Sequence, residues 1–212
     1  MDSPSYHLEN IVLTCNITPI DDANRIDLVK LVTAHNEFEY NPERFPGVII
    51  RIPQPKCTVL LFSTGKCVIT GVRAFAEIDS IIKALEKIML PFLKKSYPAV
   101  KTFNFASKVE NVVATIQLNQ FVDLNLGAVI LENSMYEPEV FPGLIYRANT
   151  ETITAVYLIF STGKMVCTKC KTEDQIKLAM NHIDQKLKEL GLVREKMSEL
   201  EDETEEEEMQ FI

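Results

Sequence analysis

YNPERFPG at residues 40–47 returns as YEPEVFPG at residues 136–143, so this chain contains an internal repeat. FSTGKCVIT at residues 62–70 likewise returns as FSTGKMVCT at residues 160–168, in the same order. A repeat of this length fixes the architecture, because each copy forms one structural unit. The predicted organisation is an N-terminal extension (1–8), a first copy (9–97), a connection (98–109), a second copy (110–196) and an acidic disordered tail (197–212).

Both copies have the same order of expected elements. Alternating apolar and polar residues predict strands, and apolar residues at steps of three and four predict helices. The expected strands include residues 11–18, 48–52, 58–63, 66–70 and 112–119, and the expected helices cover about 26–32, 78–92, 124–131 and 176–190. Thr172 and Gln175 have capping-box spacing before the last helix. The predicted class is α+β, with helices packed on one face of a long antiparallel sheet.

Both faces of that sheet are apolar. Leu60, Phe62 and Val68 share one face by the period of two, and their neighbours in sequence share the other. Helices can cover only one of these faces, so the other exposes an apolar patch too large to lack a partner. The pattern alone leaves a homodimer interface open as the use of this patch.

The net charge of −8 lies in the tail. Residues 199–212, ELEDETEEEEMQFI, hold eight acidic residues and no basic one, so the rest of the chain is neutral. An acidic run of this kind is typical of a solvated, disordered segment. A neutral body neither demonstrates nor excludes nucleic-acid binding.

The ends and the cysteines indicate an intracellular protein. The N-terminus, MDSPSYHLEN, resembles no signal peptide, and no apolar stretch approaches the roughly 18 residues of a membrane span. The cysteines are odd in number and sit mostly in apolar strand-like runs, which favours reduced, buried thiols; they are Cys15, Cys57, Cys67, Cys167 and Cys170.

Little in the sequence points to catalysis. Cys167 and Cys170 form a C-x-x-C that could hold a metal or act as a redox pair, but no second pair exists and Cys167 matches Ile69, a core position. The three histidines are scattered, and no phosphate-cradling glycine loop occurs. We therefore expect no cofactor, no metal and no enzymatic activity.

The repeated motifs resemble the conserved core of the TATA-binding protein family. Y-[NE]-P-E-x-F-P-G-[VL]-I-x-R covers residues 40–51 and 136–147, and L-[LI]-F-S-T-G-K-x-V-x-T covers 60–70 and 158–168. The resemblance extends over about residues 9–194 and implies a saddle, with a curved ten-stranded antiparallel sheet and four helices on its convex face. The acidic tail and the FPG in both copies are similar to archaeal members, which favours a cytoplasmic or nucleoid home over a eukaryotic nucleus.

The resemblance also implies a function and residues that perform it. The function is transcription initiation: binding TATA-box DNA in the minor groove, kinking it and recruiting the RNA polymerase machinery. Phe45, Phe62, Phe141 and Phe160 match the intercalating phenylalanines. Matches to the minor-groove contacts are Asn10, Asn111, Val12, Val113, Leu60, Leu158, Val68, Val166, Thr70, Thr168 and Pro142.

Further implied contacts involve the DNA backbone and protein partners. Matches to the backbone-contacting set are Arg51, Arg147, Lys66, Lys164, Thr64 and Thr162. Glu137 and Glu139 match the acidic residues that the family presents to transcription factor B. A homodimer of the free protein belongs to the same expectations. The alternative function is an interaction module that uses the apolar sheet for protein and has lost DNA binding.

The second copy departs from the family pattern in two places. Two extra residues between Arg147 and Phe160 predict a longer loop there. The run Thr70-Gly71-Val72-Arg73 becomes Thr168-Lys169-Cys170-Lys171. If the glycine of this run has a positive φ, Lys169 carries a strain of about 1 kcal/mol or more.

Overall fold

The computed structural model describes residues 4–195, so the predicted tail at 197–212 lies outside the described residues. The strands are β1 (Ser5–Thr18), β2 (Val48–Pro53), β3 (Lys56–Leu61), β4 (Lys66–Val72), β5 (Asn104–Gln117), β6 (Gln120–Val122), β7 (Ser134–Met135), β8 (Leu144–Asn149), β9 (Thr154–Ile159), β10 (Lys164–Cys170) and β11 (Val193–Glu195). The helices are α1 (Leu28–Ala34), α2 (Ile78–Ser96), α3 (Leu124–Ile130) and α4 (Glu173–Glu189), with a 3-10 turn at Phe75–Glu77 before α2.

The main sheet confirms the predicted α+β class but has nine strands where the resemblance implied ten. Its order is β2-β3-β4-β1-β5-β10-β9-β8-β7, and β6 pairs with β11 in a separate two-stranded sheet. The two copies differ at one sheet edge. Met135 of β7 pairs with Ile145 in a short strand, whereas the matched Glu39 makes only an isolated bridge to Ile49.

The described chain forms two compact units that do not coincide with the two sequence copies. Unit 2 comprises Leu8–Ala114 and Thr168–Gln175, and unit 1 contains Thr115–Cys167 and the chain from Ile176 onward, together with the residues up to His7. Strands β1, β5 and β10 each contribute to both units. The end of β10 therefore lies in the same unit as most of β1 and β5.

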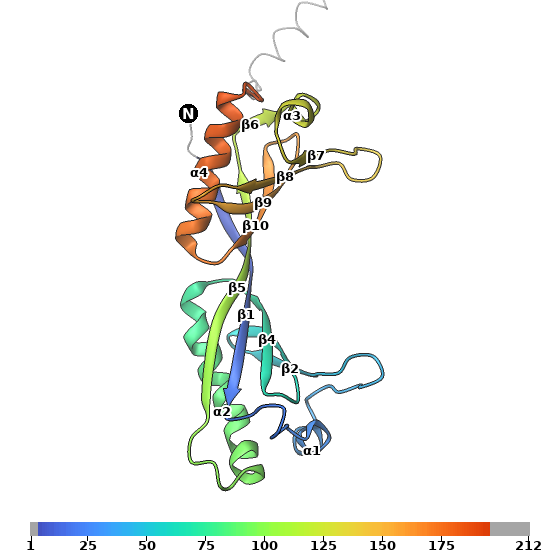
Figure 1. The fold of residues 1–212 in the computed structure, drawn as a ribbon, viewed down its shortest axis with the longest axis vertical. Helices are drawn as coiled ribbons and strands as arrows, with labels where there is room; N and C mark the ends of the chain where they lie inside the picture. Colours follow the sequence, from blue (N-terminus) through green and yellow to red (C-terminus); the bar gives the residue numbers. More distant parts are fainter. Residues whose placement is uncertain (1–3, 196–212) are drawn as a thin grey trace, which may run out of the picture. The chain divides into compact units, whose positions relative to one another are not determined.

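In unit 2, α2 covers one face of the sheet (Figure 1). Ile81, Leu85, Met89 and Leu93 recur along α2 and are fully buried. On the strands, every second residue is buried with them, as Val59, Leu61, Cys67 and Ile69 illustrate. In Figure 1 the segment that leads into β2 reaches out on the side opposite α2.

Unit 1 repeats this arrangement with α4. The buried residues of α4 are Ile176, Ala179, Ile183 and Leu187. Tyr157 of β9 is also buried, and its hydroxyl donates to the carbonyl of Ala179 at 2.9 Å. This hydrogen bond ties the helix to the sheet in addition to apolar packing.

Matched aspartates begin the two short helices. Asp27 accepts from the N–H of Lys30, and Asp123 accepts from the N–H of Leu126, both at 3.0 Å. These N-caps were not recognised in the sequence, although an aspartate three residues before a backbone donor is a typical helix start. At α4, Thr172 accepts from the N–H of Gln175 as predicted, but the Gln175 side chain accepts from Lys171 rather than from Thr172.

Two strands are longer than predicted, and one predicted difference in loop length is confirmed. The long strands β1 and β5 begin at Ser5 and Asn104, earlier than expected. The sequence did not reveal their starts, because the first six residues of each strand include no buried residue and so show no clear apolar alternation. The predicted longer loop in the second copy is confirmed: residues 150–153 separate β8 from β9, whereas residues 54–55 separate β2 from β3.

Lys169 occupies a left-handed backbone position, as predicted. Its φ is 78°, close to the 85° of the matched Gly71. The conformation is therefore kept in both copies even though only one of them has glycine. A side chain at such a φ is strained by contact between Cβ and the backbone.

We predict that Lys169→Gly raises the free energy of unfolding by about 1 kcal/mol, because glycine adopts this φ without strain. Gly71→Ala is the matched control and should lower the free energy of unfolding by a similar amount. A Cβ there meets nothing closer than 3.8 Å, so the strain comes only from the backbone conformation. Urea unfolding of the full chain measures both. Equal stability of Lys169→Gly and the parent protein would refute the strain.

Candidate nucleic-acid interface

The sheet face away from the helices is half-exposed and apolar. In unit 2, Leu60 pairs with Val68 across β3 and β4, and Val68 also lies opposite Thr14 of β1. All three are half-buried, whereas their neighbours along each strand are buried. The same alternation holds for Leu158 and Val166 in unit 1. The prediction of two apolar faces is therefore confirmed for each unit.

Each unit carries a phenylalanine pair on this face. The rings of Phe45 and Phe62 lie 5.6 Å apart at 61°, and those of Phe141 and Phe160 lie 5.8 Å apart at 63°. Both are edge-to-face contacts between half-buried rings. The structure thus brings together the residues that the sequence paired.

The glycine of each FPG motif makes room for these rings. A Cβ on Gly47 would lie 2.8 Å from the Phe45 ring, and a Cβ on Gly143 would lie 2.7 Å from the Phe141 ring. The close approach of backbone and ring explains why a residue without a side chain suits this position. The ring pairs are consequently held against the backbone.

Two asparagine amides lie beside threonines on the same face, both within unit 2. Asn10 Oδ1 accepts from the N–H of Gly71 at 2.8 Å and lies 3.3 Å from the Thr70 hydroxyl. Asn111 Oδ1 accepts from the N–H of Lys169 at 2.9 Å and from the Thr168 hydroxyl at 3.0 Å. Because the oxygen receives a backbone donor, the N–H₂ group is the end of each amide that can donate. Nδ2 of Asn10 lies 3.2 Å from the Thr70 hydroxyl oxygen, which leaves one of its two hydrogens for another acceptor.

The left-handed backbone explains this orientation. Gly71 and Lys169 each aim the N–H at an asparagine only because of their positive φ. Sequence comparison marked Lys169 as an anomaly but missed the role of its N–H group. The signal was present, since the residue after Thr168 departed from the pattern that Gly71 keeps after Thr70.

The predicted cationic residues are exposed; the lysines begin strands and the arginines lie within strands. Lys66 and Lys164 begin β4 and β10, directly after the turns that contain Thr64 and Thr162. Arg51 of β2 forms an ion pair with Glu39, while Arg147 is its exposed counterpart on β8. Exposed pairs of this kind are weak, so Arg51 can exchange Glu39 for another anion.

The remaining predicted contacts lie in the loop before β8. Glu137, Glu139 and Pro142 are exposed there. The carbonyl of Glu137 accepts from the N–H groups of Val140 and Phe141, each at 2.9 Å. The loop is thereby a turn, and both glutamates precede Phe141 closely in the chain.

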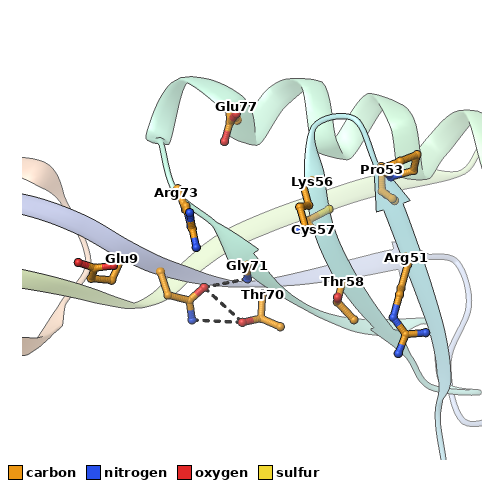
Figure 2. Close-up of a pocket in the computed structure, with 12 residues that line it drawn as sticks. Glu9, Arg51, Pro53, Lys56, Cys57, Thr58, Thr70, Gly71, Arg73 and Glu77 are labelled. Carbon is orange, nitrogen blue, oxygen red and sulfur yellow. Dashed lines mark hydrogen bonds between the residues drawn. The ribbon is translucent and has the colours of Figure 1, made fainter.

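A groove of about 840 Å³ extends from this face in unit 2 (Figure 2). Thr70 and Thr58 line one part of it, and Arg73, Lys56 and Glu77 line another. Figure 2 shows Arg73 pointing toward Gly71 from the chain that enters α2. The sequence comparison gave Arg73 no role, although the groove joins it to the Asn10 amide.

The cysteines show no sign of reactivity. All five are buried thiols. Burial raises the pKa of Cys15 and of Cys57 to about 11, and it raises the pKa of Cys67 further. These thiols are protonated at neutral pH. Among residues 4–195, no group of three or more His, Cys, Asp and Glu side chains could hold a metal ion.

No helix in the described part of the chain is long and apolar enough to cross a membrane. Each unit thus carries apolar strands, one aromatic pair and exposed cations, and unit 2 also holds both asparagine amides. These residues occur in matched positions of a duplicated sequence.

Comparisons with known proteins agree with this duplication. A model of the family described as "Transcription factor TFIID (or TATA-binding protein, TBP)" matches residues 5–92 and 106–190. The TATA-box-binding protein of Pyrobaculum aerophilum is 40% identical over 190 residues, which are 90% of this chain and 89% of that protein. The protein of the same name from Sulfolobus acidocaldarius is 39% identical, covering 97% of this chain and 94% of that one.

A solved structure extends the similarity to the fold. It is described as "Methanococcus jannaschii TBP" and aligns with a TM-score of 0.70 and 34% identity, covering 87% of this chain and 99% of the other. The sequence resemblance is therefore confirmed over both copies and by archaeal relatives. This chain belongs to the TATA-binding protein family.

Proposed function

We propose that this chain is a general transcription initiation factor that binds TATA-box DNA in the minor groove through the half-exposed sheet face. One observation carries the proposal: backbone N–H groups hold the oxygens of two half-exposed asparagine amides on an apolar surface, which leaves their N–H₂ groups to donate to a ligand. The family relatives are named for binding the TATA box. The protein acts by binding and bending, and no catalytic step is part of the proposal.

The amides suit the chemistry of A·T pairs. In the minor groove these pairs offer only acceptors, N3 of adenine and O2 of thymine, whereas G·C pairs add the guanine amino group. An amide N–H₂ can donate to these acceptors, but it cannot pair with the guanine amino group, which is itself a donor. The apolar residues on the same face of unit 2, including Val12, Val113 and Leu60, would leave the guanine amino group without a partner and pressed against carbon.

We expect the parent protein to bind a TATA duplex and to lose about 1–3 kcal/mol of binding free energy for each G·C pair introduced into the site. Gel-shift titration with the two duplexes at one salt concentration measures the difference. Equal binding to both would support the alternative of a sheet that binds protein and has lost DNA specificity. A duplex substituted only outside the site serves as the control.

The phenylalanine pairs are proposed as the wedges that kink the DNA. Apolar side chains inserted at base steps unstack them and bend the duplex, a mechanism for which TATA-binding proteins are a standard example. The pairs are half-exposed and rest on glycine backbone, so they can present aromatic edges without leaving the sheet. One pair in each unit matches a kink at each end of the bound site.

Replacing Phe141 and Phe160 by alanine should reduce both bending and affinity while the fold persists, because the rings are only half-buried. The double variant Phe45→Ala with Phe62→Ala is the matched test of the other unit. Fluorescence energy transfer between dyes at the duplex ends reports bending, and circular dichroism checks the fold. Full bending by either double variant would exclude intercalation by that pair.

The cationic residues are proposed to hold the DNA backbone. In unit 2 they are Lys66 and Arg51 with the hydroxyl of Thr64, and in unit 1 they are Lys164 and Arg147 with the hydroxyl of Thr162. Contacts to the DNA backbone carry no sequence information themselves. Their contribution falls as salt rises, because binding releases counterions from phosphate.

Glu137 and Glu139 are proposed to contact a transcription factor B family protein, which would link the DNA complex to the polymerase machinery. Exposed carboxylates at the rim of an interface steer a basic partner and set its orientation. The turn that carries them is anchored by two backbone hydrogen bonds, so the carboxylates are presented in a defined place.

Glu137→Arg with Glu139→Arg should keep binding to TATA DNA and weaken the ternary complex with transcription factor B, because the charges then repel a basic partner. Glu151→Arg, in the exposed loop between β8 and β9, is the matched control for charge reversal. Gel shifts with and without the partner separate the two complexes. Parallel loss of both, or no loss of either, would refute the assignment.

A further inference from the structure

The two copies place their cations differently beside the central asparagines. After the matched threonine, the first copy reads Gly71-Val72-Arg73 and the second reads Lys169-Cys170-Lys171. Both runs belong to unit 2, so their surroundings can be compared directly. The second copy therefore has one more cation than the first, at the position where glycine would be unstrained.

Lys171 already has partners within the protein. Its Nζ lies 3.4 Å from Glu110 Oε2, and its backbone N–H donates to Gln175 Oε1 at 2.8 Å. Glu110 also accepts from the Thr14 hydroxyl at 3.1 Å and pairs with Lys108 at 3.4 Å. The hydrogen bond from Thr14, followed by those from the lysines, lowers the pKa of Glu110, which keeps it ionised. Lys171 and Glu110 are 47% and 35% exposed, whereas Arg51 and Glu39 are 60% and 59% exposed, so solvent screens the Lys171 pair less and Lys171 is less available to another anion than Arg51.

Arg73 and Lys169 differ from Lys171 in this respect. Both are exposed, and within residues 4–195 neither forms an ion pair. Arg73 lines the groove that also contains Asn10 and Thr70 (Figure 2). Lys169 follows Thr168 directly, and its N–H holds Asn111. Although far from it in the chain, each asparagine therefore has one nearby cation in unit 2 that forms no ion pair within residues 4–195.

The backbone of Lys169 does not account for its side chain. Gly71 aims the same N–H at Asn10 at 2.8 Å, and does so without a Cβ. A residue held in a sparsely populated conformation points to a use for its side chain when glycine would serve the backbone equally well. What lysine adds over glycine at this place is an exposed positive charge beside a face proposed to receive DNA.

We propose that Lys169 is a DNA-phosphate contact of the second copy and the functional counterpart of Arg73 in the first, replacing Lys171, which Glu110 holds. The inference rests on the proposed DNA binding and adds a residue to it. The second copy thereby accepts backbone strain in exchange for an electrostatic contact.

The test is the salt dependence of binding to a TATA duplex, measured with the full chain by fluorescence anisotropy. Lys169→Gln should reduce the slope of log affinity against log salt by about 0.9, the value of one phosphate contact. Its affinity deficit should therefore grow about twofold with each halving of the salt concentration. Arg73→Gln should reduce the slope by the same amount.

Two further variants separate charge from strain. Lys169→Gly should lose the same slope while its thermal unfolding temperature rises, whereas Lys169→Gln should lose the slope without that rise. The double variant Glu110→Gln with Lys171→Gln removes the internal ion pair at constant net charge and should leave the slope unchanged.

An unchanged slope for Lys169→Gln, in a parent protein that distinguishes TATA from G·C-substituted duplex, would overturn this inference and leave the proposed function intact. A slope lowered by the Glu110 and Lys171 double variant as much as by Lys169→Gln would overturn it as well. A parent protein that does not distinguish the duplexes would overturn the proposed function, and this inference with it.

Discussion

The alternation of side chains along the strands is the constraint on which the rest of this structure depends. Each strand sends every second residue into the core beneath α2 or α4, and the residues between them face away from the helices. Since each unit has a long helix on one face only, the apolar residues of the other face stay half-exposed. Burial of the core-facing residues stabilises the fold, and the half-exposed residues remain available for binding.

Matched local devices turn that surface into a specific one. The left-handed residues that follow Thr70 and Thr168 each fix an asparagine amide with a backbone hydrogen bond. The glycine of each FPG motif leaves room for an aromatic pair. The surface is consequently pre-organised by backbone geometry before any ligand arrives, which reduces the cost of ordering it on binding.

The sequence predicted the elements that depend on periodicity and repetition. The four helices, the apolar faces and the longer β8–β9 loop were all visible in residue order, because burial repeats every two or every 3.6 residues. It did not predict that the first copy has a single bridge at Glu39 in place of a β7 strand, since that difference depends on one or two hydrogen bonds. Nor did it reveal the Glu110 cluster with Thr14 and Lys171, whose members lie far apart in the chain and meet only through strand pairing.

The most direct test of the account is binding to a duplex in which every A·T pair of the TATA box is replaced by inosine·cytosine. Inosine lacks the amino group of guanine, so this duplex keeps an A·T-like set of minor-groove acceptors while its major groove resembles G·C. If the half-exposed sheet face reads the minor groove, the protein binds the inosine duplex nearly as well as the TATA duplex and rejects the guanine duplex. Rejection of inosine and guanine duplexes alike would contradict the account, because recognition would then come from the major groove.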